Sequence, residues 1–353
     1  MYFRWFFYFS LYFLIGCGDT NDLGESHQFE FSYQIDLVQT DDKVELWFPV
    51  PQSNEVQVIS NENLNHGDLN CEKLSESTHG NHYYYCSSDN GLKNNIILTY
   101  TCNVKRNEHG AMNYSNLSTY NYDKDTDHIT VPEGQIFDDI IAENNLSKDN
   151  MRDVYEYVLN GMHYGKPKSA SESDIYYSGS NPKTDMKWLP VDQDYGFKKV
   201  SLDEVVSIYE KAKNEKGNYT FGNGNSFYAC DIGVGNCTDY HSYFMSLSRS
   251  MDIPARFHMG FSIPSGVSGS IDGYHCWADY YIDDKGWYPV DISEADKDPE
   301  KADYFFGTVN SNRVEFTTGR DLELHNYKKH INFFIYPLVE GTTFTKSFSY
   351  TNI

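Results

Sequence analysis

The sequence is poor in basic residues. Its 353 residues include 28 lysines and arginines against 51 aspartates and glutamates, which gives a formal net charge of −23. Nucleic acids and anionic lipid surfaces bind positive patches, so we expect neither as a partner of the folded chain. The sequence also has no C-x-x-C pair, internal repeat or low-complexity tract. These absences argue against zinc-ribbon, thioredoxin-like and repeat architectures.

A long hydrophobic run is missing as well. The apolar stretch from Trp5 to Ile15 is too short to cross a bilayer as a helix, and is typical of a secretory signal. The sequence L-I-G-C that ends at Cys17 resembles a bacterial lipoprotein signal. This resemblance implies a signal peptide over 1–16, a lipidated Cys17, a tether over 17–27 and attachment to a bacterial cell-envelope membrane. The alternatives are an ordinary cleaved signal and an uncleaved anchor.

The number of cysteines allows two interpretations of Cys237, as half of a disulfide or as a free thiol. An exported chain can form disulfides, and an even number of cysteines remains after Cys17: Cys71, Cys86, Cys102, Cys230, Cys237 and Cys276. If all six are paired, Cys237 is half of a bridge. If Cys237 is a free nucleophile, one other cysteine also stays unpaired, and Cys102 is the first candidate. Cys71 with Cys86 is then a candidate pair, and Cys276 is either a core residue or the partner of Cys230.

The order of apolar runs predicts two domains. Short alternating runs separated by turns cover 28–131 and predict a β-sandwich-like domain. Apolar residues at helical spacing follow, so 132–353 forms a second domain that contains helices. Within it, 164–200 is polar and shows no sustained periodicity, which predicts an irregular insertion.

The segment after Gly235 predicts a helix that begins at Cys237. Apolar positions recur at steps of three and four from Cys237 to Met251, Asn236 is a favourable N-cap, and Pro254 marks the end. The first turn of a helix exposes unpaired N–H groups and the positive end of the helix dipole. Both stabilise a thiolate, and the same N–H groups can face an oxyanion.

A base and its partner are found downstream. Alternating polarity predicts a strand over 274–282 with His275 and Trp277 on one face, followed by a returning strand that ends at Asp291. A loop over 284–286 places Asp291 opposite Asp279, on the face of His275. That pairing leaves His275 and Asp291 too far apart for a hydrogen bond, so a bulge or a shift of register has to close the gap.

These residues resemble a known family. The sequences G-N-C-T-D-Y-H at 235–241, S-R-S-M-D-I-P-A-R-F-H-M-G-F at 248–261, Y-H-C-W-A at 274–278 and G-W-Y-P-V-D at 286–291 resemble the transglutaminase-like superfamily. The resemblance implies an α+β, papain-like core, with the cysteine on a helix packed against an antiparallel sheet that carries His and Asp. It assigns Cys237 as nucleophile, His275 as general base and acid, and Asp291 as the residue that orients the imidazole.

Other residues near these motifs have weaker assignments. Tyr228 is the candidate side-chain donor to an oxyanion, and packing is the equally good alternative. His241, one helical turn after Cys237, is a supporting residue or a competing base, and Trp277 is a candidate wall of the cleft. A zinc site built from Cys237, His241, His275 and Cys276 has the right ligand types but an unusual spacing. We therefore expect no metal and no cofactor.

The expected activity is acyl transfer through a thioester on Cys237, formed from a protein or peptide amide. Water as acceptor makes the protein a peptidase or amidase, which the resemblance to bacterial members favours. An amine as acceptor makes it a cross-linking transglutaminase. A surface binding or scaffold protein that has this fold without turnover is the alternative from another class. The sequence does not define the oligomeric state.

Overall fold

The structure, a computed structural model, describes residues 23–115, 117, 129–165, 189, 192–214, 219–329 and 331–353. The predicted signal peptide and Cys17 lie outside the described residues, as does most of the predicted insertion. The predicted tether over 17–27 is wrong at its end, because strand β1 begins at Leu23. In the described part of the chain, no helix has the length and apolar character needed to cross a membrane.

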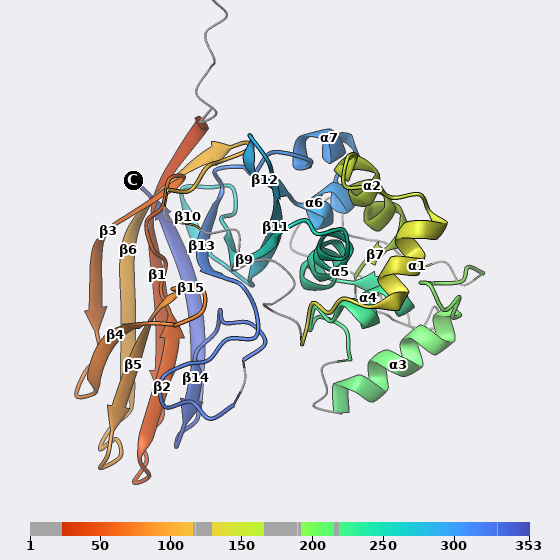
Figure 1. Cartoon of the computed structure of the whole chain (residues 1–353). Coiled ribbons are helices and arrows are strands. Elements are labelled where there is room, and N and C mark those ends of the chain that lie inside the picture. The colour runs from red at the N-terminus through yellow and green to blue at the C-terminus, as the bar shows by residue number, and fades with distance from the viewer. Residues whose placement is uncertain are drawn as a thin grey trace, which may run out of the picture.

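A β-sandwich forms one side of the molecule (Figure 1). One antiparallel sheet has the strand order β10-β15-β1-β6-β3, and the other has the order β14-β2-β5-β4. The strands of the first sheet are β1 (Leu23–Leu37), β3 (Gln57–Asn65), β6 (Ile96–His109), β10 (Ser268–Ser270) and β15 (Phe344–Asn352). Those of the second sheet are β2 (Val44–Pro49), β4 (Asn70–Ser75), β5 (His82–Ser88) and β14 (Leu338–Glu340).

Alternating side chains of β1 bring the two sheets together. Phe31, Tyr33 and Ile35 are fully buried, and the residues between them are partly exposed. Because successive side chains of a strand point to opposite faces, this pattern gives β1 one face in the core. The Tyr33 ring meets Phe48 of the facing sheet at 5.7 Å between ring centroids. The observed sandwich fits the strand pattern predicted for 28–131.

The sandwich is completed by strands from the C-terminal part of the chain. β15 pairs with β1 from Phe29 to Leu37, and β14 pairs with β2. The range 28–131 therefore contains most of the sandwich but not all of it. The chain leaves the sandwich, builds the remaining layers and returns to the sandwich at its C-terminus (Figure 1). This return connects the two parts by more than a single linker.

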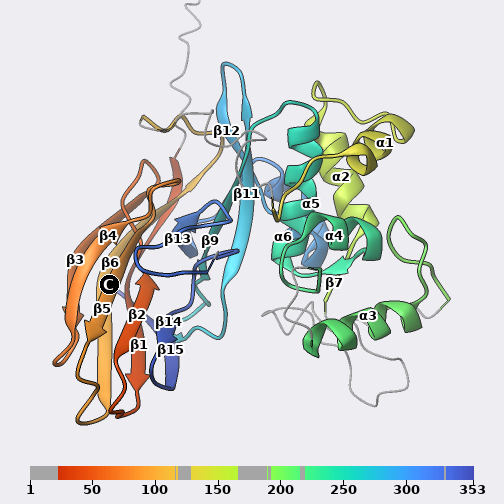
Figure 2. The same ribbon diagram turned by 60° about the horizontal axis from the view of Figure 1, so that its bottom comes forward.

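A third antiparallel sheet, of order β12-β11-β9-β13, lies between the sandwich and a layer of helices (Figures 1 and 2). Its strands are β9 (Ala255–Ser262), β11 (His275–Ile282), β12 (Gly286–Val290) and β13 (Arg313–Thr318). The short parallel pair β7 (His163–Tyr164) and β8 (Val234–Gly235) lies among the helices.

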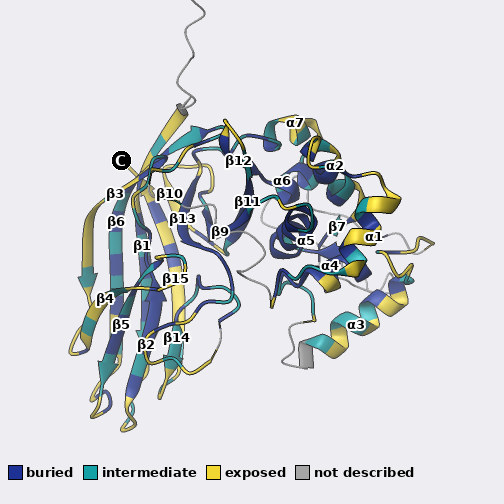
Figure 3. Cartoon of the chain, viewed as in Figure 1, coloured by how far each residue is buried: buried dark blue, intermediate teal, exposed yellow. Residues whose placement is uncertain are grey.

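Helix α5 (Cys237–Ser250) packs between this sheet and the other helices (Figure 2). Every residue from Cys237 to Arg249 is buried, and Figure 3 shows α5 as the darkest helix. The other helices are α1 (Gln135–Glu143), α2 (Met151–Gly161), α3 (Leu202–Asn214), α4 (Ser226–Ile232), α6 (Ile292–Lys297) and α7 (Ala302–Phe305), with a 3₁₀ turn, η2 (Pro299–Lys301), between the last two. The central position of α5 makes its first turn a fixed platform.

One disulfide and four free cysteines are present in the described residues. Cys71 and Cys86 lie opposite each other on β4 and β5 and are bonded, so the predicted hairpin bridge is confirmed. Cys102, Cys230, Cys237 and Cys276 are free and buried. Cys276 is therefore the core residue that was one of its two alternatives, and the bridge to Cys230 is absent. The expectation that Cys237 leaves a single other thiol unpaired is wrong.

A buried polar network joins the sandwich to the central sheet. The side-chain amide of Gln57 donates to the carbonyl of Glu315 at 2.9 Å and accepts from the N–H of Glu315 at 2.9 Å. The Glu315 carboxylate contacts His258 Nδ1 at 2.8 Å, and His258 Nε2 contacts Asp279 at 3.0 Å. Asp279 also accepts from Arg256, at 3.1 Å from Nε and 2.5 Å from Nη2. Buried charges need such partners to be stable.

This network gives stability that is lost in acid. Burial opposes ionisation, but His258 and the nearby arginines lower the pKa of Glu315 to about 2, below about 4.3 for an unfolded chain. A depressed folded-state pKa stabilises above the unfolded value, and that stability disappears as the pH falls through about 2. The unfolding free energy of the wild type should therefore fall between about pH 5 and 2. In Glu315→Gln this fall should be smaller by ~2 kcal/mol, because the variant has no carboxyl to protonate. Urea unfolding across that range checks this, and an unchanged slope contradicts it.

Candidate active site

Cys237 is the first residue of α5 and is held there by a capping box. The Asn236 side chain accepts the N–H of Thr238 at 3.0 Å, and the Asp239 carboxylate accepts the N–H of Asn236 at 2.9 Å. Gly235 permits this close approach, because a Cβ at that position would lie 2.5 Å from Cβ of Asp239. The predicted helix start and N-cap are confirmed.

Asp239 also shapes the loop that precedes the helix. Its two carboxylate oxygens accept the N–H groups of Gly222 and Gly224, each at 2.9 Å. Burial raises the pKa of this carboxyl to about 7, although the backbone donors favour the ionised form. One buried carboxyl thus fixes both the first turn of α5 and the segment 222–224 beside it.

The hairpin of β11 and β12 brings His275 and Asp291 to one face by a register that differs from the predicted one. Ile282 pairs with Gly286, so the turn is 283–285, and the pairing is shifted by one residue on each strand. Continued along the strands, this register puts Asp291 opposite Trp277, two residues closer to His275 than the predicted position opposite Asp279. Gly286 has φ 84°, a conformation that glycine adopts at little cost.

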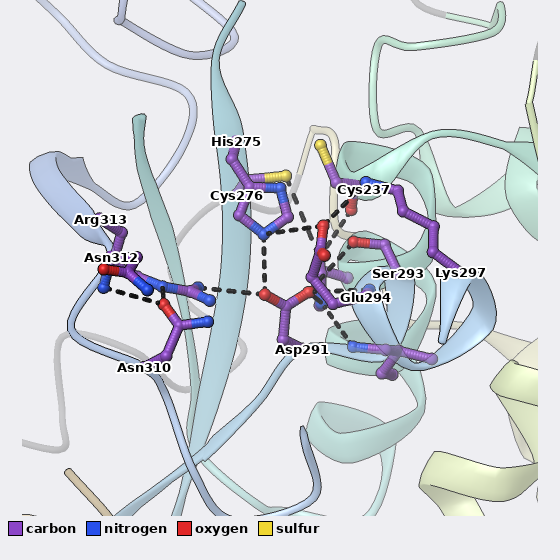
Figure 4. Close-up of polar contacts among 12 residues, drawn as sticks. Cys237, His275, Cys276, Asp291, Ser293, Glu294, Lys297, Asn310, Asn312 and Arg313 are labelled. Carbon is purple, nitrogen blue, oxygen red and sulfur yellow. Dashed lines mark hydrogen bonds and ion pairs between the residues drawn. The ribbon is translucent and has the colours of Figure 1, made fainter. Parts of the chain in front are cut away.

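His275 and Asp291 are in direct contact (Figure 4). His275 Nε2 lies 2.7 Å from Asp291 Oδ2, and the same oxygen accepts from Arg313 Nη1 at 3.0 Å. The other carboxylate oxygen accepts from the Ser293 hydroxyl and from the N–H of Glu294. Asp291 is fully buried, so these donors replace the water that a carboxylate requires. With Nε2 on Asp291, Nδ1 is the ring nitrogen of His275 that is left for the thiol of Cys237.

The electrostatics favour an ion pair between Cys237 and His275. Burial raises the pKa of the Cys237 thiol, but hydrogen bonds with Cys276 and His275 and the positive charge of His275 hold it well below its usual range. Burial lowers the pKa of His275, but the Asp291 carboxylate and the bond to Cys237 raise it to about 9. Together these shifts favour thiolate and imidazolium near neutral pH.

His241 links the two halves of the site instead of serving as a second base. Its Nδ1 lies 2.7 Å from the carbonyl of Cys237, and its Nε2 accepts the N–H of Ile292 at 3.1 Å. These contacts require the neutral tautomer with the proton on Nδ1. Burial lowers the pKa of His241 to about 4, which agrees with that tautomer. The supporting position expected for His241 is the one observed.

A cleft of about 500 Å³ opens beside Cys237. Its described lining is largely aromatic and consists of Tyr164, Tyr209, Ala212, Thr220, Phe221, Gly222, Asn236, Cys237, Gly273, Tyr274 and Tyr336. Tyr274 O–H lies 3.4 Å from the side-chain amide of Asn236, next to the reactive position. The described residues contain no cluster of ligands suited to a metal ion.

The structure does not place Tyr228 or Trp277 in this cleft. Tyr228 is fully buried in a separate core with Tyr195 and Val234. Trp277 lies behind His275, with 6.2 Å between the two ring centroids, and stacks on His258 at 5.5 Å. Tyr228 thus has the packing position that was its alternative, and Trp277 packs behind the imidazole, since an aromatic residue near a motif fits packing as well as a cleft.

Several residues of the site were missed by sequence reasoning. Lys297 and Glu294 form an ion pair beside the catalytic candidates, and Arg313 reaches Asp291 from β13 (Figure 4). Lys297 and Glu294 are three residues apart on a short helix, a spacing that usually indicates an exposed pair. Arg313 is distant in sequence and has no local signal that links it to Asp291.

The fold and these contacts define an α+β protein with N-terminal antiparallel sheets and a buried Cys, His and Asp set at a helix N-terminus. Residues 190–292 match the family model described as the transglutaminase-like superfamily, so the core region is transglutaminase-like. An uncharacterized protein of Haemophilus influenzae is 31% identical in an alignment of 139 residues, and the match covers 30% of this chain. The match spans 38% of that relative's length.

Two solved structures are also similar. The structure named "Putative Cysteine Protease", from Cytophaga hutchinsonii, has a TM-score of 0.49 at 13% identity, and the alignment covers 94% of this chain and 100% of that one. The periplasmic domain of TgpA from Pseudomonas aeruginosa has a TM-score of 0.28 at 11% identity, with 78% and 74% of the two chains covered.

The pKa of Cys237 gives a direct test of the site. Iodoacetamide should alkylate Cys237 rapidly at pH 6, where an ordinary thiol with a pKa near 8.5 is almost entirely protonated. Asp291→Asn should raise the alkylation midpoint of Cys237 by about 1 to 2 pH units, because His275 loses the charge that holds its proton. Mass spectrometry of timed reactions measures this, with Cys102, whose pKa burial raises to about 12, as internal reference. A midpoint near 8.5 in the wild type contradicts it.

Proposed function

We propose that this protein is a cysteine acyltransfer enzyme that forms a thioester on Cys237 from a peptide or protein amide and hydrolyses it. The observation that carries the proposal is the 2.7 Å contact between Asp291 and His275, beside the thiol of Cys237 at the start of α5 (Figure 4). Cysteine catalysis needs a thiolate, a proton carrier and a group that fixes the carrier's orientation. These side chains meet that requirement.

In the first half of the reaction, the Cys237 sulfur attacks the carbonyl carbon of the amide. The electron pair of the C=O bond moves onto oxygen, and N–H donors of the first turn of α5 face that oxyanion. The intermediate collapses to a thioester as the C–N bond breaks. The His275 imidazolium gives its proton to the leaving nitrogen, and ammonia or an amine departs.

In the second half, water replaces the amine. Neutral His275 takes a proton from the water as its oxygen attacks the thioester carbon, and the C–S bond breaks to release a carboxylic acid and the thiolate. His275 is then again an imidazolium, held by Asp291. An amine that attacks in place of water gives an amide, which makes transglutamination an outcome of the same experiment.

The cleft suits a peptide acyl group and not a polyanion. The described residues that line it carry no basic side chain, and the chain has a net charge of −23. Five aromatic residues among them provide apolar surface for a side chain next to the scissile amide. We also propose that the protein is exported and attached to a membrane of the cell envelope through a lipid on Cys17. This attachment would hold the enzyme in the compartment of its substrate.

Trapping of the thioester tests the activity. A library of peptide amides and glutamine peptides, quenched with acid, should leave an acyl adduct on Cys237 of the wild type. A parallel reaction quenched with hydroxylamine should release the same acyl groups as hydroxamates. Cys237→Ala should remove the adduct entirely, and His275→Ala should slow its formation by about 10³-fold or more. Added methylamine separates the acceptors, because it yields a methylamide only if amines compete with water.

Cys102→Ala is the matched control, because this variant also removes a buried free thiol, but one in the sandwich. It should react like the wild type. Adduct formation that persists in Cys237→Ala, or the absence of any adduct from a folded wild type that alkylates at pH 6, would overturn the proposal and favour a binding protein with this fold.

A further inference from the structure

A buried ion pair stands beside the thiol and has no role in the reaction as described above. Lys297 Nζ lies 2.7 Å from Glu294 Oε1, and the Lys297 side chain is 5% exposed. The ammonium also lies 4.5 Å from the ring centroid of Tyr164, which lines the cleft together with Cys237. Burial of an ammonium is unfavourable unless partners offset it. Lysine side chains are normally exposed, so the buried position of Lys297 depends on these contacts.

The pair contacts both sides of the catalytic candidates. Glu294 Oε1 is 3.8 Å from His275 Nε2, on the side of the ring where Asp291 binds. The charge of Lys297 contributes to the lowered pKa of Cys237. In Figure 4, Lys297 and Glu294 extend from α6 toward Cys237 and His275. The ammonium is thus on the thiol side of the site and the carboxylate on the imidazole side.

The other titratable or charged groups around this pair come from every neighbouring element. They are Cys276 and His275 on β11, His241 and Asp239 on α5, Arg313 on β13, Asp291 before α6, Tyr164 on β7, and Tyr274 and Tyr336 along the cleft. Within this set, Arg313 is bound to Asp291 and His275 is the proton carrier. Arg313 and Lys297 both keep their charge through a proton-transfer cycle of His275, and Lys297 is the one whose side chain binds Glu294 and not Asp291.

We propose that Lys297 is a positioning residue that acts as a second, permanent cation for the Cys237 thiolate, and that Glu294 is the tether that fixes its ammonium inside the protein. His275 is neutral while the thioester stands and regains its proton only as the C–S bond breaks, so negative charge returns to the sulfur while the imidazole is still being protonated. Lys297 supplies a charge that does not change in that step. This inference rests on the proposed role of Cys237 as a thiolate nucleophile.

The pH dependence of Cys237 alkylation tests this role. Lys297→Met keeps the length of the side chain and removes its charge, so the midpoint should rise by about one pH unit and labelling at pH 6 should slow about tenfold. Lys297→Arg keeps the charge and should restore the wild-type midpoint. Circular dichroism melts of each variant show that the protein is folded at the temperature of labelling.

A double variant separates the effect of the Lys297 charge on Cys237 from the effect of leaving Glu294 without its partner. Lys297→Met alone leaves the partly buried Glu294 carboxylate without its cation, whereas Glu294→Gln with Lys297→Met removes that unpaired charge. If Lys297 acts on the thiolate, the double variant retains the raised midpoint. A wild-type midpoint in the double variant would overturn the proposal, as would Lys297→Met with a lower melting temperature and an unchanged midpoint.

The chain offers a matched control four residues further on. Lys301 and Asp298 form a pair with the same spacing at 2.9 Å, but their side chains are 61% and 34% exposed. Lys301→Met should leave the midpoint unchanged, and an equal shift in both variants would reduce the effect to overall charge. If the wild type itself titrates near pH 8.5, the proposed function fails. If the wild type has a low midpoint and Lys297→Met does not change it, the proposed function is retained and the proposed role of Lys297 is wrong.

Discussion

The site depends on one buried carboxylate, that of Asp291. It has no exposed surface and receives donors from His275 on β11, Arg313 on β13 and the first turn of α6. A buried charge is tolerated only when its partners are fixed in place. The carboxylate therefore holds a strand, a neighbouring strand and a helix in one geometry. The same contacts orient the imidazole and maintain its proton.

The order around Asp291 extends into the sandwich. The guanidinium of Arg313 lies 4.8 Å from the ring of Trp277, and Trp277 stacks on His258, which bonds to Glu315. Glu315 is tied to the sandwich strand β3 through Gln57. The Trp277 ring, which packs behind His275, is thus held by a polar network that is bonded to the sandwich. On the other side, His241 connects the first turn of α5 to the backbone after Asp291. The sandwich and the helices both restrict the distance between thiol and imidazole.

Local signals in the sequence predicted the parts of this site that local rules determine. The cap at Asn236 and the periodicity after Cys237 gave the start of α5, and strand parity placed His275 and Asp291 on one face. The exact register of the hairpin required knowledge of the turn, since a turn at 283–285 and one at 284–286 are both consistent with the glycine at 286. Most short apolar runs of 28–131 became strands of the sandwich, because their alternation is also a local property.

Long-range partners were not predictable in this way. β14 and β15 complete the sandwich from the end of the chain, where nothing in their sequence identifies β2 and β1 as partners. Arg313 and Lys297 act on the site through tertiary contacts, and an i, i+3 acid–base pair has the pattern of a solvated surface. The alternative bridge between Cys230 and Cys276 came from counting alone, and counting does not measure distance. The predictions that failed concern contacts between residues that are distant in the sequence. There the sequence gives the residue types but does not show which residues are neighbours in space.

The central claim is that Cys237 and His275 exist as thiolate and imidazolium at neutral pH. Nitrogen NMR of ¹⁵N-histidine-labelled protein measures the charge of the imidazole directly, and the His275→Ala variant assigns its resonances. The account predicts imidazolium shifts for both ring nitrogens of His275 at pH 7 and a loss of the proton near pH 9. Blocking Cys237 with iodoacetamide should lower that value, because the thiolate is removed. A neutral His275 at pH 7 that titrates near 6.5, with or without the block, would contradict the account.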